Sequence, residues 1–162
     1  MITLRPPGPG DLGWIVERHG ALYAAEFGWD HRFEGVVAGV VADYVKTYDP
    51  TREACWIAEQ ADDQGGRKVG SIMLAREDDT VGRLRLLLVE PSARGLGVAE
   101  ALVRACLDRA REAGYAEVVL WTQSILLPAR RLYARFGFEL EKSWPYDGFA
   151  DGLISESWRL KL

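Results

Sequence analysis

Apolar positions recur with a helical period in four stretches of the chain. Asp11 is expected to cap a first helix, because apolar residues follow it at steps of three and four. The same spacing between residues 33 and 44 predicts a second helix that ends before Pro50. Residues 99–110 carry an apolar stripe opposite charged residues, and Gly114 is expected to end this third helix. A short fourth helix is predicted for residues 128–136.

The segments between these helices are predicted to be strands. They cover residues 2–5, 54–59, 68–76, 83–89, 117–121, 138–144 and 154–160. The strand 83–89 ends in consecutive apolar residues, which predicts that both of its faces are buried. The order of elements predicts an α/β (α+β) fold, in which about four helices flank a mixed, mostly antiparallel sheet of roughly six or seven strands.

Length and composition fit one soluble domain over residues 1–162, with 48% apolar and 27% charged residues. The net charge of −4 argues against a nucleic-acid partner, which would need a basic face. The N-terminus lacks the apolar core of a signal peptide, and no apolar run approaches the roughly 20 residues that span a bilayer. We therefore expect a cytoplasmic protein that does not bind membranes. Cys55 and Cys106 form no metal-binding or redox pattern, so no metal site is expected.

The junction from Val89 to Ala99 is the segment most suited to chemistry. A strand ends at Pro91, a loop with Gly95 and Gly97 follows, and a helix begins almost at once. A helix start presents unpaired N–H groups at the positive end of the helix dipole, and glycine permits unusual backbone angles there. These features form an anion site suited to a pyrophosphate, to which Arg94 adds a charge.

Two glycines alone would also be explained by a tight turn between strand and helix. The segment lacks the Gly-Lys-Ser/Thr ending of a P-loop, and it lacks the GxGxxG spacing of a dinucleotide-binding loop. The choice between a turn and an anion site therefore depends on the rest of the chain.

A resemblance to a known family decides this choice. The pattern Arg94-x-x-Gly97-x-Ala99 resembles the Arg/Gln-x-x-Gly-x-Gly/Ala signature of the GCN5-related N-acetyltransferases, the GNAT superfamily. The segment Leu132-Tyr133-Ala134-Arg135-Phe136-Gly137-Phe138 resembles the family's Leu-Tyr-x-x-x-Gly-Phe segment. The predicted order of elements also resembles this fold from end to end.

Four further segments are similar to one subgroup, the acetyltransferase domain fused behind MarR-type winged-helix regulators. They are Arg18–Tyr23, Phe27–Asp30, Leu84–Pro91 and Leu120–Thr122. The chain has no room for the winged helix and would correspond to the catalytic half alone.

The resemblance implies direct transfer of an acetyl group from acetyl-CoA, without a metal, to an amine of a small molecule or a protein. It implies that backbone groups of Leu87, Leu88 and Val89 bind the pantetheine arm and polarise the thioester carbonyl. The pyrophosphate would be held by the segment Arg94, Gly95, Leu96, Gly97, Val98 and Ala99. Gln123, placed just after its strand, keeps the side-chain amide expected there and would supply a hydrogen bond to the cofactor.

Tyr133 matches the family tyrosine that protonates the leaving thiolate, and a phenol is protonated at neutral pH. The base is less clear, because the strand 83–89 lacks the glutamate that many relatives carry within it. Glu26 is the first candidate and His19 the second. A water relay is the third alternative. The missing glutamate also favours the alternative of a non-catalytic acyl-CoA sensor.

The acceptor pocket is expected near the first two helices and the last two strands. Its candidate residues are the aromatic Tyr23, Phe27, Trp29, Tyr146 and Phe149, and the acidic Asp30, Asp147 and Asp151. The aromatic residues would equally suit an ordinary core, and the acidic ones an ordinary solvated loop. The sequence leaves the acceptor unidentified, and it leaves a homodimer open.

Overall fold

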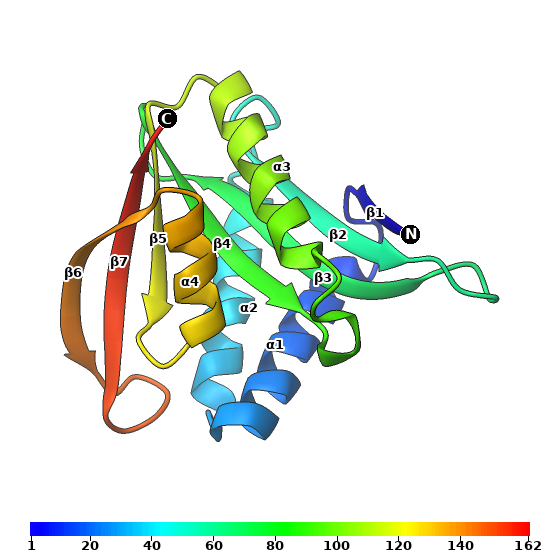
Figure 1. Cartoon of the computed structure of the whole chain (residues 1–162), viewed down its shortest axis with the longest axis horizontal. Helices are drawn as coiled ribbons and strands as arrows, with labels where there is room; N and C mark the ends of the chain where they lie inside the picture. The colour runs from blue at the N-terminus through cyan, green and yellow to red at the C-terminus, as the bar shows by residue number, and fades with distance from the viewer.

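A seven-stranded sheet forms the centre of the computed structural model, which describes residues 1–162 (Figure 1). The strands are β1 (Ile2–Arg5), β2 (Ala54–Gln60), β3 (Arg67–Arg76), β4 (Val81–Val89), β5 (Glu117–Gln123), β6 (Glu139–Tyr146) and β7 (Leu153–Lys161). The helices are α1 (Asp11–Phe27), α2 (His31–Lys46), α3 (Val98–Glu112) and α4 (Leu127–Arg135), with a short 3-10 helix at Pro91–Ala93. The predicted fold class and the predicted order of elements are confirmed.

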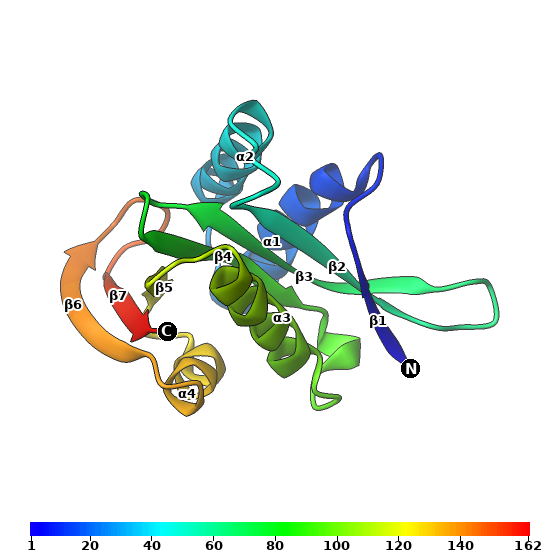
Figure 2. The same cartoon turned by 90° about the horizontal axis from the view of Figure 1, so that it is seen from above.

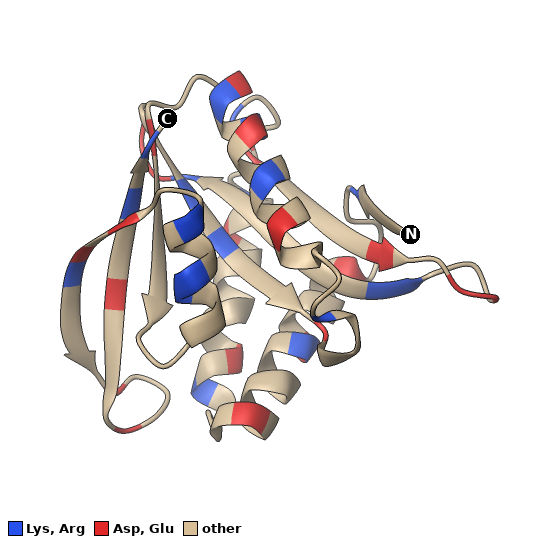
Figure 3. Cartoon of the chain, in the orientation of Figure 1, with Lys and Arg blue, Asp and Glu red and all other residues tan.

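The helices cover both faces of the sheet. The strand order is β1-β2-β3-β4-β5-β7-β6, and every neighbouring pair is antiparallel except β4 and β5. Figure 2 shows α1 and α2 on one face, and α3 and α4 on the other. None of the helices has the length and apolar character needed to cross a membrane, and Figure 3 shows charged residues on each of them.

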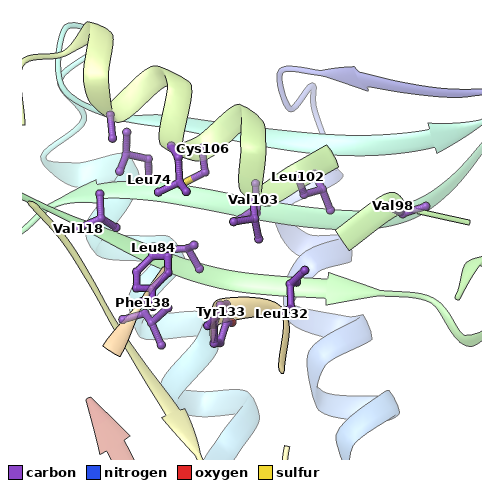
Figure 4. Close-up of a cluster of buried hydrophobic side chains, with 14 of the residues drawn as sticks. Leu74, Leu84, Val98, Leu102, Val103, Cys106, Val118, Leu132, Tyr133 and Phe138 are labelled. Carbon is purple, nitrogen blue, oxygen red and sulfur yellow. The ribbon is translucent and has the colours of Figure 1, made fainter. Parts of the chain in front are cut away.

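The larger part of the core lies between the sheet and α3. Figure 4 shows the side chains of Val98, Leu102, Val103 and Cys106 pointing from α3 toward the sheet. This is the apolar stripe predicted from residues 99–110, extended by one residue, Val98, at its start. Burial raises the pKa of the Cys106 thiol, so this side chain is an unreactive part of the core.

β4 and β5 separate soon after they begin to pair. Their parallel ladder covers only Val81–Arg83 and Glu117–Val119. On its other side, β4 carries a bulge: Arg85 pairs with Met73 and Leu88 with Ser71, so two residues of β4 face one residue of β3. A gap therefore opens between β4 and β5 toward their carboxyl ends.

The bulge is centred on Leu86, the only non-glycine residue with a positive φ, at 54°. Such a backbone costs energy and persists only where its surroundings hold it. The Ser71 hydroxyl provides part of this hold, because it donates to the Leu86 carbonyl at 2.9 Å. The prediction that both faces of this strand are buried is wrong for Leu86 and Leu87, which are only partly buried because they border the gap.

Two predicted boundaries also need correction. The N-cap of α1 is Gly10, with a φ of 87°, and Asp11 is the first helical residue. Asp11 is buried because its carboxylate serves tertiary contacts: it binds Arg5 at 2.6 Å and Lys68 at 3.1 Å. At the other boundary, β5 continues through Gln123, since Gln123 still pairs with Ser155 of β7.

The contacts of Asp11 predict that the free energy of unfolding depends on pH in the acidic range. The hydrogen bond from Arg5 lowers the pKa of Asp11 to about 2, from an ordinary 3.8. The carboxylate therefore stabilises the fold above pH 4, by about 2 kcal/mol, and this contribution is lost as the pH falls toward 2. Denaturant unfolding should show Asp11→Asn to be less stable than the parent at pH 7, with a much smaller difference at pH 2.5. A difference that is equal at both pH values would contradict this role.

Candidate active site

The gap between β4 and β5 opens into a cavity of about 360 Å³. Its walls come from Arg83–Leu87 of β4, Trp121–Gln123 of β5, and side chains of α1, α2, α4, β6 and β7. Most of these side chains are apolar or aromatic, and none is Asp or Glu. A concave apolar site with a few polar groups is the usual form of a small-molecule site.

The chain leaves β4 directly into the predicted anion site at the start of α3. Gly95 and Gly97 both have a φ of 78°, and a Cβ atom at either position would meet nothing within 4 Å. Glycine is thus required here for its backbone angle, while the space in front of it stays open. The first backbone bond of α3 runs from the Ala101 N–H to the Gly97 carbonyl at 3.0 Å.

The backbone N–H groups of residues 95–100 donate no hydrogen bond within the protein. Together with the dipole of the fifteen-residue helix α3, they form a cradle of donors for an anion. The residues present therefore fit the pyrophosphate of CoA. The cradle adjoins the gap between β4 and β5, because the chain runs from β4 directly into the cradle.

Two ion pairs join α1 to this segment. Arg94 binds the Glu26 carboxylate at 2.5 Å, and Arg18 binds Glu90 at 2.5 Å. Arg94 remains half-exposed, so it can also contact a bound phosphate. Glu26 is thus placed beside the pyrophosphate cradle and is not part of the cavity wall.

Tyr133 of α4 lines the cavity with its buried ring, and Figure 4 shows it beside Leu132 among the side chains packed near β4. Its hydroxyl has no hydrogen-bond partner in the protein. Every side-chain nitrogen or oxygen atom that is fully buried does have a partner, so the Tyr133 hydroxyl is not fully buried. The hydroxyl therefore reaches the open cavity. Burial and the nearby Tyr23 raise the pKa of the phenol, so the phenol stays protonated and can donate.

The helix that carries Tyr133 is fixed to the sheet by a buried contact. Arg130, one turn earlier in α4, binds Glu156 of β7 through two bonds of 2.9 and 3.1 Å. Glu156 is 3% exposed and also accepts from the Trp158 indole N–H at 3.2 Å. This arrangement holds α4, and with it the Tyr133 phenol, against β7.

His19 of α1 also lines the cavity. Its Nδ1 lies 2.7 Å from the Ile15 carbonyl, which only an N–H can satisfy, so Nε2 is the nitrogen without a proton. Nε2 has no partner in the protein and is open to the cavity by the same reasoning as for Tyr133. Burial lowers the pKa of His19 to about 4, so the ring is neutral at physiological pH.

Aromatic side chains from distant segments line the cavity. Of the five predicted aromatic residues, Tyr23, Trp29 and Phe149 line it, and Phe27 and Tyr146 do not. The Trp29 ring lies 4.7 Å from Phe149 and thereby joins the α1–α2 connection to the β6–β7 connection.

The predicted acidic residues are not part of the cavity wall. Asp30 caps α2 by accepting the Arg32 N–H and also binds the Arg32 guanidinium. Asp147 and Asp151 lie near the same arginine and raise its pKa. These carboxylates form a surface group around Arg32.

Gln123 is buried, lines the cavity, and binds the Ser155 hydroxyl through its amide at 3.0 Å. Three other lining residues, Phe33, Trp121 and Arg85, were not predicted from the sequence. Arg85 had a detectable signal, because a charged residue inside an apolar strand is unusual. Phe33 and Trp121 had none, since aromatic residues in such positions usually belong to the core.

Known proteins share both the sequence and the fold. The family model described as acetyltransferase (GNAT) family matches residues 18–138. The human protein N-acetyltransferase 8 is 34% identical over 122 residues, which cover 72% of this chain and 52% of the human protein. The chain thus spans about half the length of the curated relatives it matches.

Two solved structures have the same fold. The structure of yncA from Salmonella typhimurium with its cofactor acetyl-CoA gives a TM-score of 0.76 at 20% identity, covering 99% of this chain and 94% of that one. Spermidine N-acetyltransferase from Vibrio cholerae, in complex with CoA and spermine, gives a TM-score of 0.73 at 19% identity, with coverages of 99% and 95%.

Proposed function

Because the chain belongs to the acetyltransferase (GNAT) family, we propose that it transfers the acetyl group of acetyl-CoA directly to the nitrogen of an amine. One observation carries this proposal. A glycine cradle with free N–H groups at residues 95–100 adjoins a cavity that contains the unpartnered hydroxyl of Tyr133. An anion site and a proton donor are the two groups that acetyl transfer from CoA requires.

Acetyl-CoA supplies the thioester whose acetyl group is transferred. The residues 95–100 and Arg94 bind its pyrophosphate, and β4 binds its pantetheine arm. On the side facing β5, β4 has no ladder partner beyond Arg83, so peptide groups of Leu87, Leu88 and Val89 are free for this purpose. A backbone N–H in this stretch polarises the thioester carbonyl and stabilises the negative charge that develops on its oxygen.

The cavity side chains move the protons. As the amine nitrogen forms its bond to the acetyl carbon and the C–S bond breaks, Nε2 of His19 accepts a proton from the amine. Tyr133 donates its phenolic proton to the leaving sulfur, which gives the free thiol of CoA. Proton exchange with water then restores both side chains. Gln123 helps to shape the wall through its bond to Ser155.

We assign the base to His19 in preference to Glu26. His19→Phe should keep the ring packing and lower kcat by about a hundredfold, because the proton acceptor is lost. Glu26→Gln should instead change the KM for acetyl-CoA and leave kcat nearly unchanged, because it releases Arg94. Steady-state kinetics with both variants checks this assignment. A large loss of kcat in Glu26→Gln alone would identify Glu26 as the base. No loss of kcat in either variant would favour a water relay.

The test of the function itself is an assay of thiol release. The protein is incubated with acetyl-CoA and a panel of amines, and free CoA is measured against a reaction without amine. Release that depends on the amine supports the transferase. Saturable CoA binding with no turnover on any amine would support the acyl-CoA sensor.

Three features remain predictions from the sequence. They are the likeness to the domain fused behind MarR-type regulators, the cytoplasmic location and the homodimer. The free edge of β6, on which Leu140 and Trp144 are exposed, is the strand to which a second copy would add.

A further inference from the structure

Arg85 lies in the middle of β4, where the strand borders the cavity. Leu84 and Leu87 both pack into the core on the α3 side, whereas Leu86 packs with the smaller cluster on the α1 and α2 side. The bulge thus turns two consecutive residues, Arg85 and Leu86, to the face that α1 and α2 cover. This is also the face from which His19 lines the cavity.

The guanidinium of Arg85 makes no ion pair and no hydrogen bond within the protein. The other arginine of the cavity, Arg83, binds Glu77 at 2.6 Å. Glu77 and Asp43 are close enough to act on Arg85 electrostatically, but neither forms a bond with it. The cavity wall contains no carboxylate of its own.

Arg85 is therefore a partly buried cation without a partner. Burial and the neighbouring Arg83 lower its pKa, which shows that its charge is disfavoured where it stands. No unpartnered side-chain nitrogen or oxygen atom is buried, so the guanidinium of Arg85 reaches the open cavity, where a ligand can pair with it. A ligand for this position must be an anion.

We propose that Arg85 binds a carboxylate of the acceptor, and that the acceptor is a free α-amino acid with an apolar side chain. This inference rests on the proposed function, whose substrate class it names. A guanidinium offers two parallel N–H donors that match a carboxylate.

The spacing along β4 agrees with an α-amino acid. Arg85 and Leu87 are two residues apart, so their Cα atoms are separated by at most about 7 Å. If Leu87 lies beside the reacting thioester, the anion site and the reaction centre are separated by a distance that one small molecule bridges. A lysine side chain or a protein N-terminus has no carboxylate so close to its nitrogen.

The rest of the wall matches the remaining part of such a molecule. The rings of Trp29, Phe33 and Trp121 line the cavity and offer apolar surface to a side chain. The volume of about 360 Å³ is at the small end of ligand sites, as expected for an acceptor the size of an amino acid.

The experiment compares three amines that differ only in the carboxylate: phenylalanine, phenylalaninamide and phenethylamine. The parent protein should acetylate phenylalanine with a kcat/KM about 10- to 100-fold above that of the other two. Arg85→Gln should remove this preference by lowering the value for phenylalanine alone. The KM for acetyl-CoA should not change, and Arg111→Gln, on the exposed side of α3, should behave as the parent.

Thermal unfolding separates binding from folding. Arg85 has no partner to lose, so Arg85→Gln should melt at or above the temperature of the parent. If Arg85→Gln does not fold, Arg85→Lys keeps the charge without the forked donors and should lose part of the preference.

Equal activity on all three amines, a preference for the amide, or a preference that survives in Arg85→Gln would overturn the inference and leave the transferase intact. The absence of turnover on every amine would overturn the proposed function, and this inference with it.

Discussion

Gly97→Glu is expected to weaken the binding of acetyl-CoA by at least about a hundredfold. Gly97 has a φ of 78°, and its N–H belongs to the cradle at the start of α3. The Cβ atom of a glutamate there meets nothing within 4 Å, but the residue strains the backbone and places a negative charge at the proposed phosphate site. Like charges in contact cost several kcal/mol, and a hundredfold loss corresponds to about 3 kcal/mol. Calorimetric titration with acetyl-CoA measures the loss directly.

Gly114, at the other end of α3, provides a matched control. It has a φ of 84° and open space around its Cβ position, so Gly114→Glu introduces similar strain and the same charge. It lies far from the cradle along the helix, and acetyl-CoA binding should be retained. If both variants lose binding equally, general damage to α3 explains the loss and the assignment of the pyrophosphate site is wrong.

Tyr133→Phe is expected to lower kcat by about a hundredfold and to leave the dissociation constant of acetyl-CoA nearly unchanged. The hydroxyl is the proposed proton donor to the leaving sulfur, and loss of such a donor typically costs about 10²–10⁴-fold in rate. The same hydroxyl makes no hydrogen bond within the protein, so its removal should hardly affect the melting temperature. Single-turnover kinetics and thermal unfolding of the same samples test both statements.

Tyr115→Phe is the control for the loss of a phenolic hydroxyl. The Tyr115 hydroxyl donates to the Arg52 carbonyl at 2.9 Å, outside the cavity. Its loss should lower the free energy of unfolding by about 1 kcal/mol and leave kcat unchanged. A Tyr133→Phe variant that loses stability and CoA affinity as much as turnover would show that Tyr133 has a packing role only.

The order of helices and strands could be predicted because the spacing of apolar residues is a local property of each segment. The stripe of residues 99–110 and the strand 2–5 both appear where they were expected. The predicted boundaries that proved wrong are those that a tertiary contact determines. Asp11 forms salt bridges with Arg5 and Lys68 and does not cap its helix, and β5 extends to Gln123 because β7 pairs with it.

The choice between Glu26 and His19 shows the same limit inside the site. The two residues are seven positions apart, so they share one face of α1, and the sequence alone could not separate them. Seven residues of helix are about 10 Å long, which takes Glu26 past the cavity to the cradle while His19 stays at the wall. Only the placement of α1 across the sheet assigns the two side chains to different contacts.

The sequence by itself predicted the cofactor site that we propose for this protein. A glycine's positive φ, the free N–H groups of a helix start and the strand before them arise within a dozen consecutive residues. The segment 89–99 therefore indicated an anion site, and the family resemblance of the chain indicated that the anion is the pyrophosphate of CoA. The tertiary structure decided the acceptor side. The bulge at Leu86 depends on the register with β3, and it turns Arg85 toward a cavity that His19 and Tyr133 reach from two other elements. Local backbone preferences determine the cradle at the start of α3, whereas only long-range packing brings the cavity residues together.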